Sequence, residues 1–286
     1  MRRPVTWLDV FTSVPLTGNQ LAVVHDADGI DDETMLAFAR ETRLSETTFV
    51  QSATQDGADY RNRIFAAPRE LRFAGHPSLG TAVAVARARG ERSAAYVQQT
   101  HAGLQPIEVE VEADGDAAHA SMLQEPASFG PQPDPATVMA AAGLTAADLH
   151  PDLPPQVVST GQPHLMAAVS DAATLDRAQP DRATMSSLLE SLGALVLYLV
   201  AVDPPAQRAG ARGFFVDRGA VIEDPATGSA AGPLLAYLRE RAGTTALTIE
   251  QGLKMGRPSQ IDCTWENDRP RVSGDVVVVA DGHVRL

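Results

Sequence analysis

The sequence predicts an α+β fold of two pseudo-symmetric halves, each a barrel-like sheet around a central helix. Many short strand-like segments recur along the 286 residues, whereas one long apolar helix follows each of two Gly-rich turns. This pattern favours a mixed arrangement over a parallel sheet. The two turns also resemble each other, because His76-Pro77 matches Asp224-Pro225, 148 residues further along the chain. We therefore interpret the chain as a duplicated half.

The first half reads as strands with two helices. Alternating or β-branched segments predict strands, and carboxylates before an apolar pattern predict the start of a helix. Strands are expected at residues 6–11, 21–24, 44–50, 60–65, 94–97 and 107–111, and helices from residue 31 and over about 78–89.

The second half repeats this order. Thr17-Gly18 matches Thr160-Gly161 and Phe65 matches Phe214, at offsets of 143 and 149 residues. Helices are expected at 135–142 and 186–192 and after Gly228, a helical turn at 146–148, and strands at 157–169, 195–202, 212–216, 248–252, 255–259 and 276–279.

A Pro-rich stretch, residues 124–135, is the expected crossing between domains. We predict an N-terminal half over residues 1–126, joined by the C-terminal strand 274–286, and a C-terminal half over 127–273.

Composition narrows the range of partners. The net charge of −13 argues against nucleic acid or an anionic membrane as the main partner. Cys263 is the only cysteine, which excludes an intrachain disulfide and suits a reducing compartment. The longest apolar run, residues 194–202, is too short to span a bilayer, and residues 1–9 lack the apolar core of a signal peptide. We expect a soluble, cytoplasmic protein without a membrane partner.

Three acid–base candidates accompany the two helix starts. The free N–H groups at a helix N-terminus favour an anion, so two such ends can hold a carboxylate substrate from both sides. His76 belongs to the first motif and Asp224 to the second. Glu46 lies in a β-rich segment between Leu44 and Phe49, where desolvation would raise its pKa toward the range useful for proton transfer.

Each candidate also has a structural interpretation. Glu46 could face solvent or cap a local turn, and His76 could be a turn histidine bonded to a backbone carbonyl. Asp224 could cap the helix that follows it. A metal site is weakly supported, because the seven histidines form no His-x-His or His-x-x-x-His pair. The absence of a Gly-x-Ser-x-Gly elbow argues against a serine hydrolase.

Taken together, these motifs resemble the PhzF-like phenazine-biosynthesis family over essentially the whole chain. The segments that carry the resemblance are residues 17–19, 44–47, 73–80, 223–230, 249–252 and 255–259. The family is similar in fold to diaminopimelate epimerase, with two α+β halves and an active site between them. The resemblance implies a dimer without a cofactor.

The resemblance also implies roles for individual residues. Glu46 would move a proton between carbons of the substrate, and His76 and Asp224 would assist protonation or orient the substrate. The backbones at Gly75 and Gly228, with Ser229, would bind its carboxylate, and Asn19 and Ser45 are also expected to bind the substrate.

The chain departs from related patterns at several positions. Epimerases and proline racemases of this fold use one cysteine per half, which a chain with Cys263 alone cannot do. Gln20, Arg43 and Arg72 stand where the family commonly has proline, asparagine and proline.

These observations predict a cofactor-independent isomerase that shifts a proton on a small carboxylic acid bound between the halves. The alternative is a non-catalytic ligand-binding or interaction protein of the same fold, and a hydrolase is a weaker third interpretation. Loss of turnover with retained binding in Glu46→Gln would distinguish the isomerase from the binding protein.

Overall fold

A computed structural model describes residues 1–203, 205 and 207–286 of the chain. It consists of two compact units. Unit 1 comprises Met1–Leu123 and Ser273–Leu286, and unit 2 comprises Gln124–Val272. The strand β17 (Arg269–Arg285) contributes its first residues to unit 2 and the rest to unit 1.

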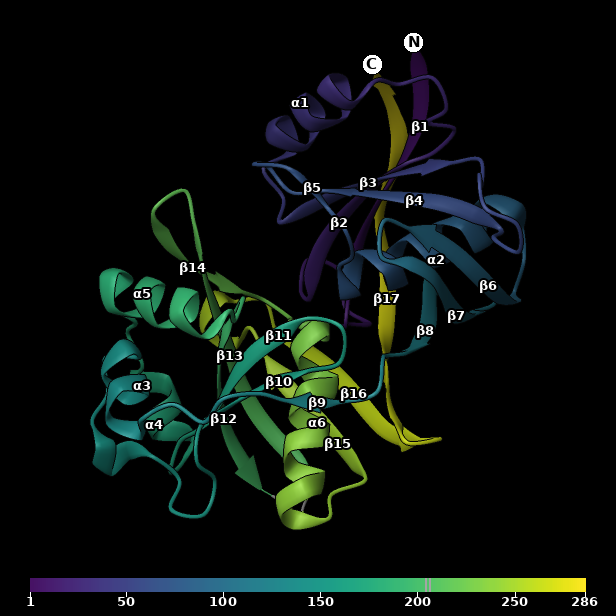
Figure 1. The fold of residues 1–286 in the computed structure, drawn as a ribbon. Coiled ribbons are helices and arrows are strands. Elements are labelled where there is room, and N and C mark those ends of the chain that lie inside the picture. Colours follow the sequence, from purple (N-terminus) through teal and green to yellow (C-terminus); the bar gives the residue numbers. More distant parts are fainter. Residues whose placement is uncertain (204, 206) are drawn as a thin grey trace. The chain divides into compact units, whose positions relative to one another are not determined.

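Unit 1, all of whose residues are described, is a closed ring of eight strands. Consecutive pairings run β1–β2–β3–β4–β6–β7–β8, and β17 pairs with both β8 and β1, which closes the ring. The chain termini lie side by side, because Arg2 pairs with Arg285 (Figure 1). The strands are β1 (Arg2–Val10), β2 (Asn19–Val24), β3 (Glu46–Gln51), β4 (Tyr60–Phe65), β6 (Ser93–Thr100), β7 (Gly103–Val111) and β8 (Ala117–Leu123), and the short β5 (Glu70–Leu71) pairs with β4.

The helix α2 (Gly75–Arg89) fills this ring. Every residue from Gly75 to Ala86 is buried. A helix that is apolar on all sides is typical of a core position, and its Gly, Ala, Ser and Val side chains let the strands approach closely. At Gly80 an added Cβ would lie 2.6 Å from the Leu21 side chain. The amphipathic helix α1 (Asp32–Thr42) packs outside the ring, with Met35 and Ala39 buried.

Unit 2 repeats this topology. In unit 1, β2 and β3 are parallel, β3 and β4 antiparallel, and β4 and β6 parallel; in unit 2 the same relations hold for β11–β12, β12–β13 and β13–β15. Its strands are β9 (Ser128–Phe129), β10 (Gln156–Ser159), β11 (Pro163–Ala168), β12 (Leu197–Asp203), β13 (Arg208–Asp217), β14 (Ala220–Asp224), β15 (Ala246–Gln251) and β16 (Ser259–Glu266). Its helices are α3 (Pro135–Ala141), η1 (Ala146–Asp148), α4 (Ala172–Arg177), α5 (Arg182–Leu192), α6 (Gly228–Ala242) and η2 (Leu253–Met255).

The helix α6 is the counterpart of α2. It packs against β10, β11, β15 and β16 (Figure 1). Residues 230–238 are buried. A separate apolar cluster lies between the sheet and the helices α3, α4 and α5, around Met139, Leu165, Met185 and Phe214. The predicted α+β fold with a central helix in each half is confirmed.

The expected register between the halves is wrong. Matching His76-Pro77 with Asp224-Pro225 gives an offset of 148, whereas α2 begins at Gly75 and α6 at Gly228, an offset of 153. The helix expected over 78–89 begins three residues earlier, at Gly75. His76 is the second residue of its helix, and the residue in that position of α6 is Ser229, not Asp224. The strand expected at 255–259 is wrong, because η2 ends at Met255 and β16 begins only at Ser259. The strands β8 and β14 and the helix α4 were not expected from the sequence.

A bidentate ion pair anchors the hairpin before each central helix. In unit 1, Arg63 Nε and Nη2 donate to Glu70 at 2.7 and 2.6 Å. In unit 2, Arg212 donates in the same way to Glu223 at 2.9 and 2.8 Å. Each guanidinium also lies over an aromatic ring two residues later, Phe65 or Phe214. Each glutamate precedes its helix by five residues, so the pair fixes the strand that leads into the helix start.

We expect Glu223→Gln to lower the free energy of unfolding by about 2 kcal/mol, because it leaves the Arg212 guanidinium largely buried without its counter-charge. The side chains of Arg212 and Glu223 are 13% and 17% exposed. Glu250→Gln is the matched control. The side chains of Glu250 and its partner Arg208 are 47% and 55% exposed, so this ion pair should contribute under about 1 kcal/mol to the free energy of unfolding. Urea unfolding of the two variants checks this, and equal losses would contradict it.

Among the described residues, no helix is both long enough and apolar enough to span a membrane.

Candidate active site

Glu46 and His76 meet at the start of α2. Glu46 is the first residue of β3, beside Leu21 of the parallel strand β2, and His76 follows the first residue of the helix. Glu46 Oε2 lies 3.5 Å from His76 Nε2, and the two side chains are 17% and 7% exposed. A carboxyl group therefore faces an imidazole in a place that is largely shielded from water.

The His76 ring is neutral in this setting. Burial lowers its pKa to about 3, and an interaction with the Gln20 backbone only partly opposes the shift. An ionised Glu46 at 3.5 Å would also favour the imidazolium, but this separation is long for a strong hydrogen bond. The cost of burying a charge prevails, so the pair is a carboxyl group beside a neutral imidazole rather than a salt bridge.

The other expected residues of unit 1 lie around this pair. Gly75 is buried as the first residue of α2, and its N-cap residue Ala74 has no side chain that could occupy the helix N–H groups. Ser45 is exposed and immediately precedes Glu46. Asn19 is buried at the start of β2 and pairs with Val10. The N-terminus of α2 therefore combines backbone donors with an acid–base group, which suits binding and deprotonation of an anion.

In unit 2, Asp224 ends β14 and contacts the turn that starts α6. Thr227 Oγ1 donates to Asp224 Oδ2 at 2.7 Å. Thr227 is the N-cap residue, and Gly228 and Ser229 are the first two residues of the helix. Asp224 thus lies three residues before the N-cap residue and accepts from its side chain.

Sequence reasoning missed Gln124, which holds the first turn of α6. Its side-chain Nε2 donates to the Gly228 carbonyl at 2.9 Å, and its Oε1 accepts from Thr160 at 2.6 Å. At Gly232 an added Cβ would lie 2.0 Å from Gln124 Oε1, so a larger residue there would displace this amide. A glutamine at the end of the first half carries no signature of its own, so no local signal could have revealed this contact.

A second buried histidine accompanies α6. His164 on β11 is 1% exposed and faces the backbone of Ser229. Pro233 lies four residues after Ser229 and has no N–H, so the Ser229 carbonyl lacks its usual helical donor. Burial lowers the pKa of His164 to about 4, and the interaction with Ser229 partly opposes the shift.

These two histidines predict a loss of stability in acid. The unfolded chain binds protons on them below the ordinary value of 6.5, whereas the folded protein does so only near pH 3 for His76 and pH 4 for His164. The unfolded state is therefore favoured as the pH falls from 6.5, by about 2 kcal/mol per histidine at pH 5. The free energy of unfolding, measured in urea, should therefore be lower at pH 5 than at pH 7. His164→Leu and His76→Gln should each reduce this difference by about 2 kcal/mol. An unchanged pH dependence in both variants would contradict the assignment.

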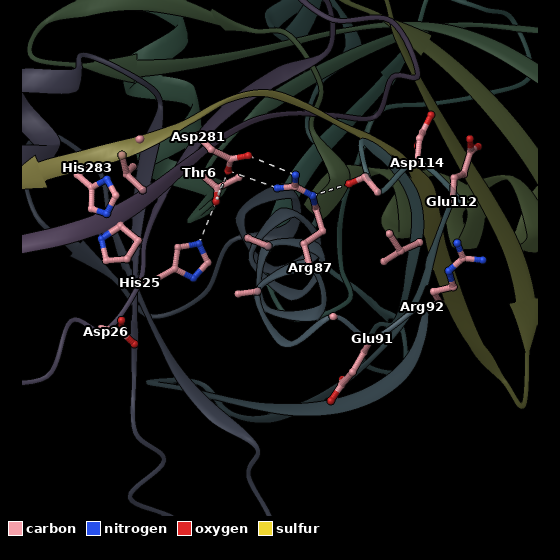
Figure 2. A pocket seen from close by; sticks show the side chains of 18 of the residues that line it. Thr6, His25, Asp26, Arg87, Glu91, Arg92, Glu112, Asp114, Asp281 and His283 are labelled. Atoms are coloured by element: carbon pink, nitrogen blue, oxygen red, sulfur yellow. Dashed lines mark hydrogen bonds and ion pairs between the residues drawn. The ribbon is translucent and has the colours of Figure 1, made fainter.

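A cavity of about 900 Å³ in unit 1 lies at the other end of α2. Figure 2 shows Arg87 joining Asp281 to the loop that follows β7, and Thr6 lying between His25 and Asp281. None of the expected site residues lines it. We interpret this cavity as a polar junction of β1, β17 and α2, separate from the Glu46–His76 pair.

In the part of the chain that the structure describes, no group of three or more His, Cys, Asp or Glu side chains is arranged to hold a metal ion. Cys263 is buried in β16, where burial raises its pKa.

Comparison with known proteins places these features in a family. The family model of phenazine biosynthesis-like proteins, PhzC-PhzF, matches residues 8–282. The chain is 34% identical to trans-2,3-dihydro-3-hydroxyanthranilate isomerase of Pseudomonas aeruginosa, over 98% of each chain.

Solved structures agree with this result. A phenazine biosynthesis protein of the PhzF family from Bacillus anthracis is 26% identical, with a TM-score of 0.87 and full coverage of both chains. A hydroxyproline epimerase from Agrobacterium vitis has a TM-score of 0.65 at 13% identity, over 99% of this chain and 92% of that one, which shows a common fold. The chain thus belongs to the PhzF family, whose relatives named here include an isomerase.

Proposed function

We propose that this protein is a cofactor-independent isomerase that shifts a proton on a small carboxylic acid, with Glu46 as the acid–base. The observation that carries the proposal is the Glu46 carboxyl group, 3.5 Å from a neutral His76 at the N-terminus of a buried helix. The isomerase named among its relatives supports the reaction class.

In the proposed reaction, the Glu46 carboxylate takes a proton from a carbon of the bound acid, and the C–H electron pair remains on the substrate. The resulting negative charge spreads over the conjugated system and the substrate carboxylate. Helix N–H groups at Gly75 stabilise that charge. While it is protonated, the Glu46 carboxyl group exchanges its proton with solvent, because its side chain is 17% exposed. Glu46 then gives a proton to another carbon, so one C–H bond breaks and one forms, and in ordinary water the mass does not change. Neutral His76 keeps the carboxyl group of Glu46 oriented between the two steps.

We further propose that Asp224, Gly228 and Ser229 of unit 2 take part in binding the same acid. Asn19 and Ser45 would complete its binding from unit 1. The first compound to test is trans-2,3-dihydro-3-hydroxyanthranilate, after which the Pseudomonas aeruginosa relative is named. The homodimer and the cytoplasmic location stay predictions.

The test is incubation of the protein in heavy water with a panel of unsaturated cyclic acids and amino acids that includes this compound. Deuterium at carbon with an otherwise unchanged molecular mass is the expected result. A product heavier by one water would instead indicate a hydrolase. Thermal stabilisation by an acid that is neither labelled nor isomerised would indicate a ligand-binding protein, and either outcome would overturn the proposal.

A further inference from the structure

The motif at residues 249–252 contains a buried side-chain amide, that of Gln251, which the proposed reaction does not use. Gln251 is the last residue of β15 and is 1% exposed. Its side chain makes four hydrogen bonds. Oε1 accepts from the Thr227 backbone N–H at 3.1 Å and from the Tyr198 hydroxyl at 2.9 Å. Nε2 donates to the Asp224 carbonyl at 2.8 Å and to Thr227 Oγ1 at 2.9 Å.

Two backbone groups fix the orientation of this amide. A backbone N–H can only donate and a backbone carbonyl can only accept. Rotating the Gln251 amide by half a turn would place its NH₂ against the Thr227 N–H and its oxygen against the Asp224 carbonyl, and both contacts would be repulsive. The oxygen therefore faces Thr227 N, and the nitrogen faces Asp224 O.

The fixed amide determines where the Thr227 hydroxyl proton points. Because Gln251 Nε2 donates to Thr227 Oγ1, the hydroxyl proton is directed away from Gln251. It donates to Asp224 Oδ2 at 2.7 Å. Tyr198, Gln251, Thr227 and Asp224 thus form a chain of hydrogen bonds whose last donor points at the carboxylate. A carboxyl group that accepts such a bond is stabilised in its ionised form.

Close packing holds the chain in this geometry. At Gly213, which pairs with Asp224 across the hairpin, an added Cβ would lie 2.6 Å from Thr227 Oγ1 and 3.3 Å from Gln251 Nε2. Gly252 lies against the backbone at Pro225 from the other side. The approach at Gly213 leaves no room for a Cβ beside the threonine hydroxyl.

The ionisable groups around Asp224 are consistent with its negative charge. Tyr198 and Cys263 are buried, and burial raises the pKa of both, so both are neutral. Glu223, on the preceding residue, is neutralised by its bidentate pair with Arg212.

Unit 1 also has a buried glutamine on the strand that matches β15, but in a different register. Tyr60 pairs with Gln98, whereas Ala209, 149 residues after Tyr60, pairs with Ile249 and not with Gln251. The Gln98 amide bonds to Asn62, Tyr60 and Gln105, all on neighbouring strands. The glutamine of this strand thus contacts the motif before the helix in unit 2, whereas these bonds of Gln98 stay within the sheet of unit 1.

We propose that Gln251 is a positioning residue that directs the Thr227 hydroxyl onto Asp224 and thereby keeps Asp224 as an ionised hydrogen-bond acceptor. In the reaction, Asp224 then orients a donor group of the substrate and does not supply a proton. This last consequence rests on the proposed function, whereas the hydrogen-bond chain does not.

The first experiment measures the titration of the Asp224 carboxyl carbon by ¹³C NMR, with Asp224→Asn to assign the signal. Thr227→Val removes the hydroxyl, and Asp224 should then bind its proton about tenfold more tightly. Thr227→Ser should restore the titration of the parent. Gln251→Met should shift the titration in the same direction as Thr227→Val, while Gln98→Met, the matched loss of a buried amide in unit 1, should leave it unchanged. An unchanged titration in Thr227→Val, or equal shifts in the two methionine variants, would overturn the proposal.

The second experiment follows the pH profile of kcat/KM on any acid that acquires deuterium. Thr227→Val should shift the low-pH limb of this profile to higher pH, by the same amount as the pKa of Asp224 shifts in the NMR titration. Thr227→Ser should return the limb to its position in the parent protein. A limb that does not follow the NMR titration would overturn the role of an ionised Asp224 in the reaction. If the parent labels no acid, the proposed function fails, while the NMR result still decides whether the hydrogen-bond chain exists.

Discussion

Glu46→Gln is expected to lower the rate of deuterium incorporation by about 10²- to 10⁴-fold, the usual contribution of a general acid–base. The amide has nearly the shape of the carboxyl group but cannot accept a proton from carbon. Because Glu46 is the first residue of β3 and its side chain is partly exposed, the fold should tolerate the change. The measurement compares single-turnover labelling with binding of the same acid by thermal shift.

Glu41→Gln is the control, since Glu41 is an exposed carboxylate of α1 close to Glu46 in the sequence. It should retain the activity of the parent. Binding should be largely retained in Glu46→Gln, because the helix N–H groups at Gly75 are unchanged. Equal labelling in Glu46→Gln and the parent would remove Glu46 from its role and leave His76 and Asp224 as candidates.

Gly252→Ala is expected to cause the largest loss of stability among the substitutions considered. Gly252 has a φ of +77°, and an added Cβ would lie 2.2 Å from the Arg257 carbonyl oxygen and 2.7 Å from that of Pro225. Both obstacles are backbone atoms, so relief requires movement of the chain. We expect the strain of the left-handed conformation, about 1–2 kcal/mol, plus a steric cost of about 1–3 kcal/mol.

Gly256→Ala separates these two contributions. Gly256 has a φ of +67° at the other end of η2, but nothing lies within 4 Å of its Cβ position. It should therefore show the conformational cost alone. Urea unfolding of the two variants gives the difference, and similar losses would mean that the crowding at Gly252 is relieved without cost. Because Pro225 belongs to the Asp224 motif, Gly252→Ala should also impair substrate binding.

The duplication was predictable from the sequence, but its register was not. Phe65 and Phe214 occupy matching strands, and they are 149 residues apart. The hairpin that follows is four residues longer in unit 2, because Phe65 pairs with Glu70 whereas Phe214 pairs with Glu223. This insertion changes the offset to 153 at the helix starts. The similarity of His76-Pro77 to Asp224-Pro225 concealed the difference, since a Pro-containing pair near a helix start occurs in both halves at different positions.

The candidate acid–base groups were predictable, whereas the side chains that hold them were not. Glu46 and His76 belong to motifs with recognisable chemistry, so their residue types alone suggested a role. Gln251 and Gln124 act through contacts with Asp224 and Gly228 that are distant in sequence, and a buried amide has no characteristic pattern. The Arg-x-Phe pattern at Arg63 and Arg212 was a usable signal, because it recurs at the offset already known for Phe65 and Phe214.

The shared strand β17 has a consequence for synthesis of the protein on the ribosome. The ring of unit 1 closes only when β17 pairs with β1 and β8. In the pairing with β1, Arg2 lies opposite Arg285, near the end of β17. The first strands emerge long before that partner exists, so β1 has an exposed edge while all of unit 2 is being translated. Unit 2 needs only the first residues of β17 and can fold earlier. The half that is made first is therefore completed last, and the nascent chain is most open to chaperones or to aggregation through β1 during this interval.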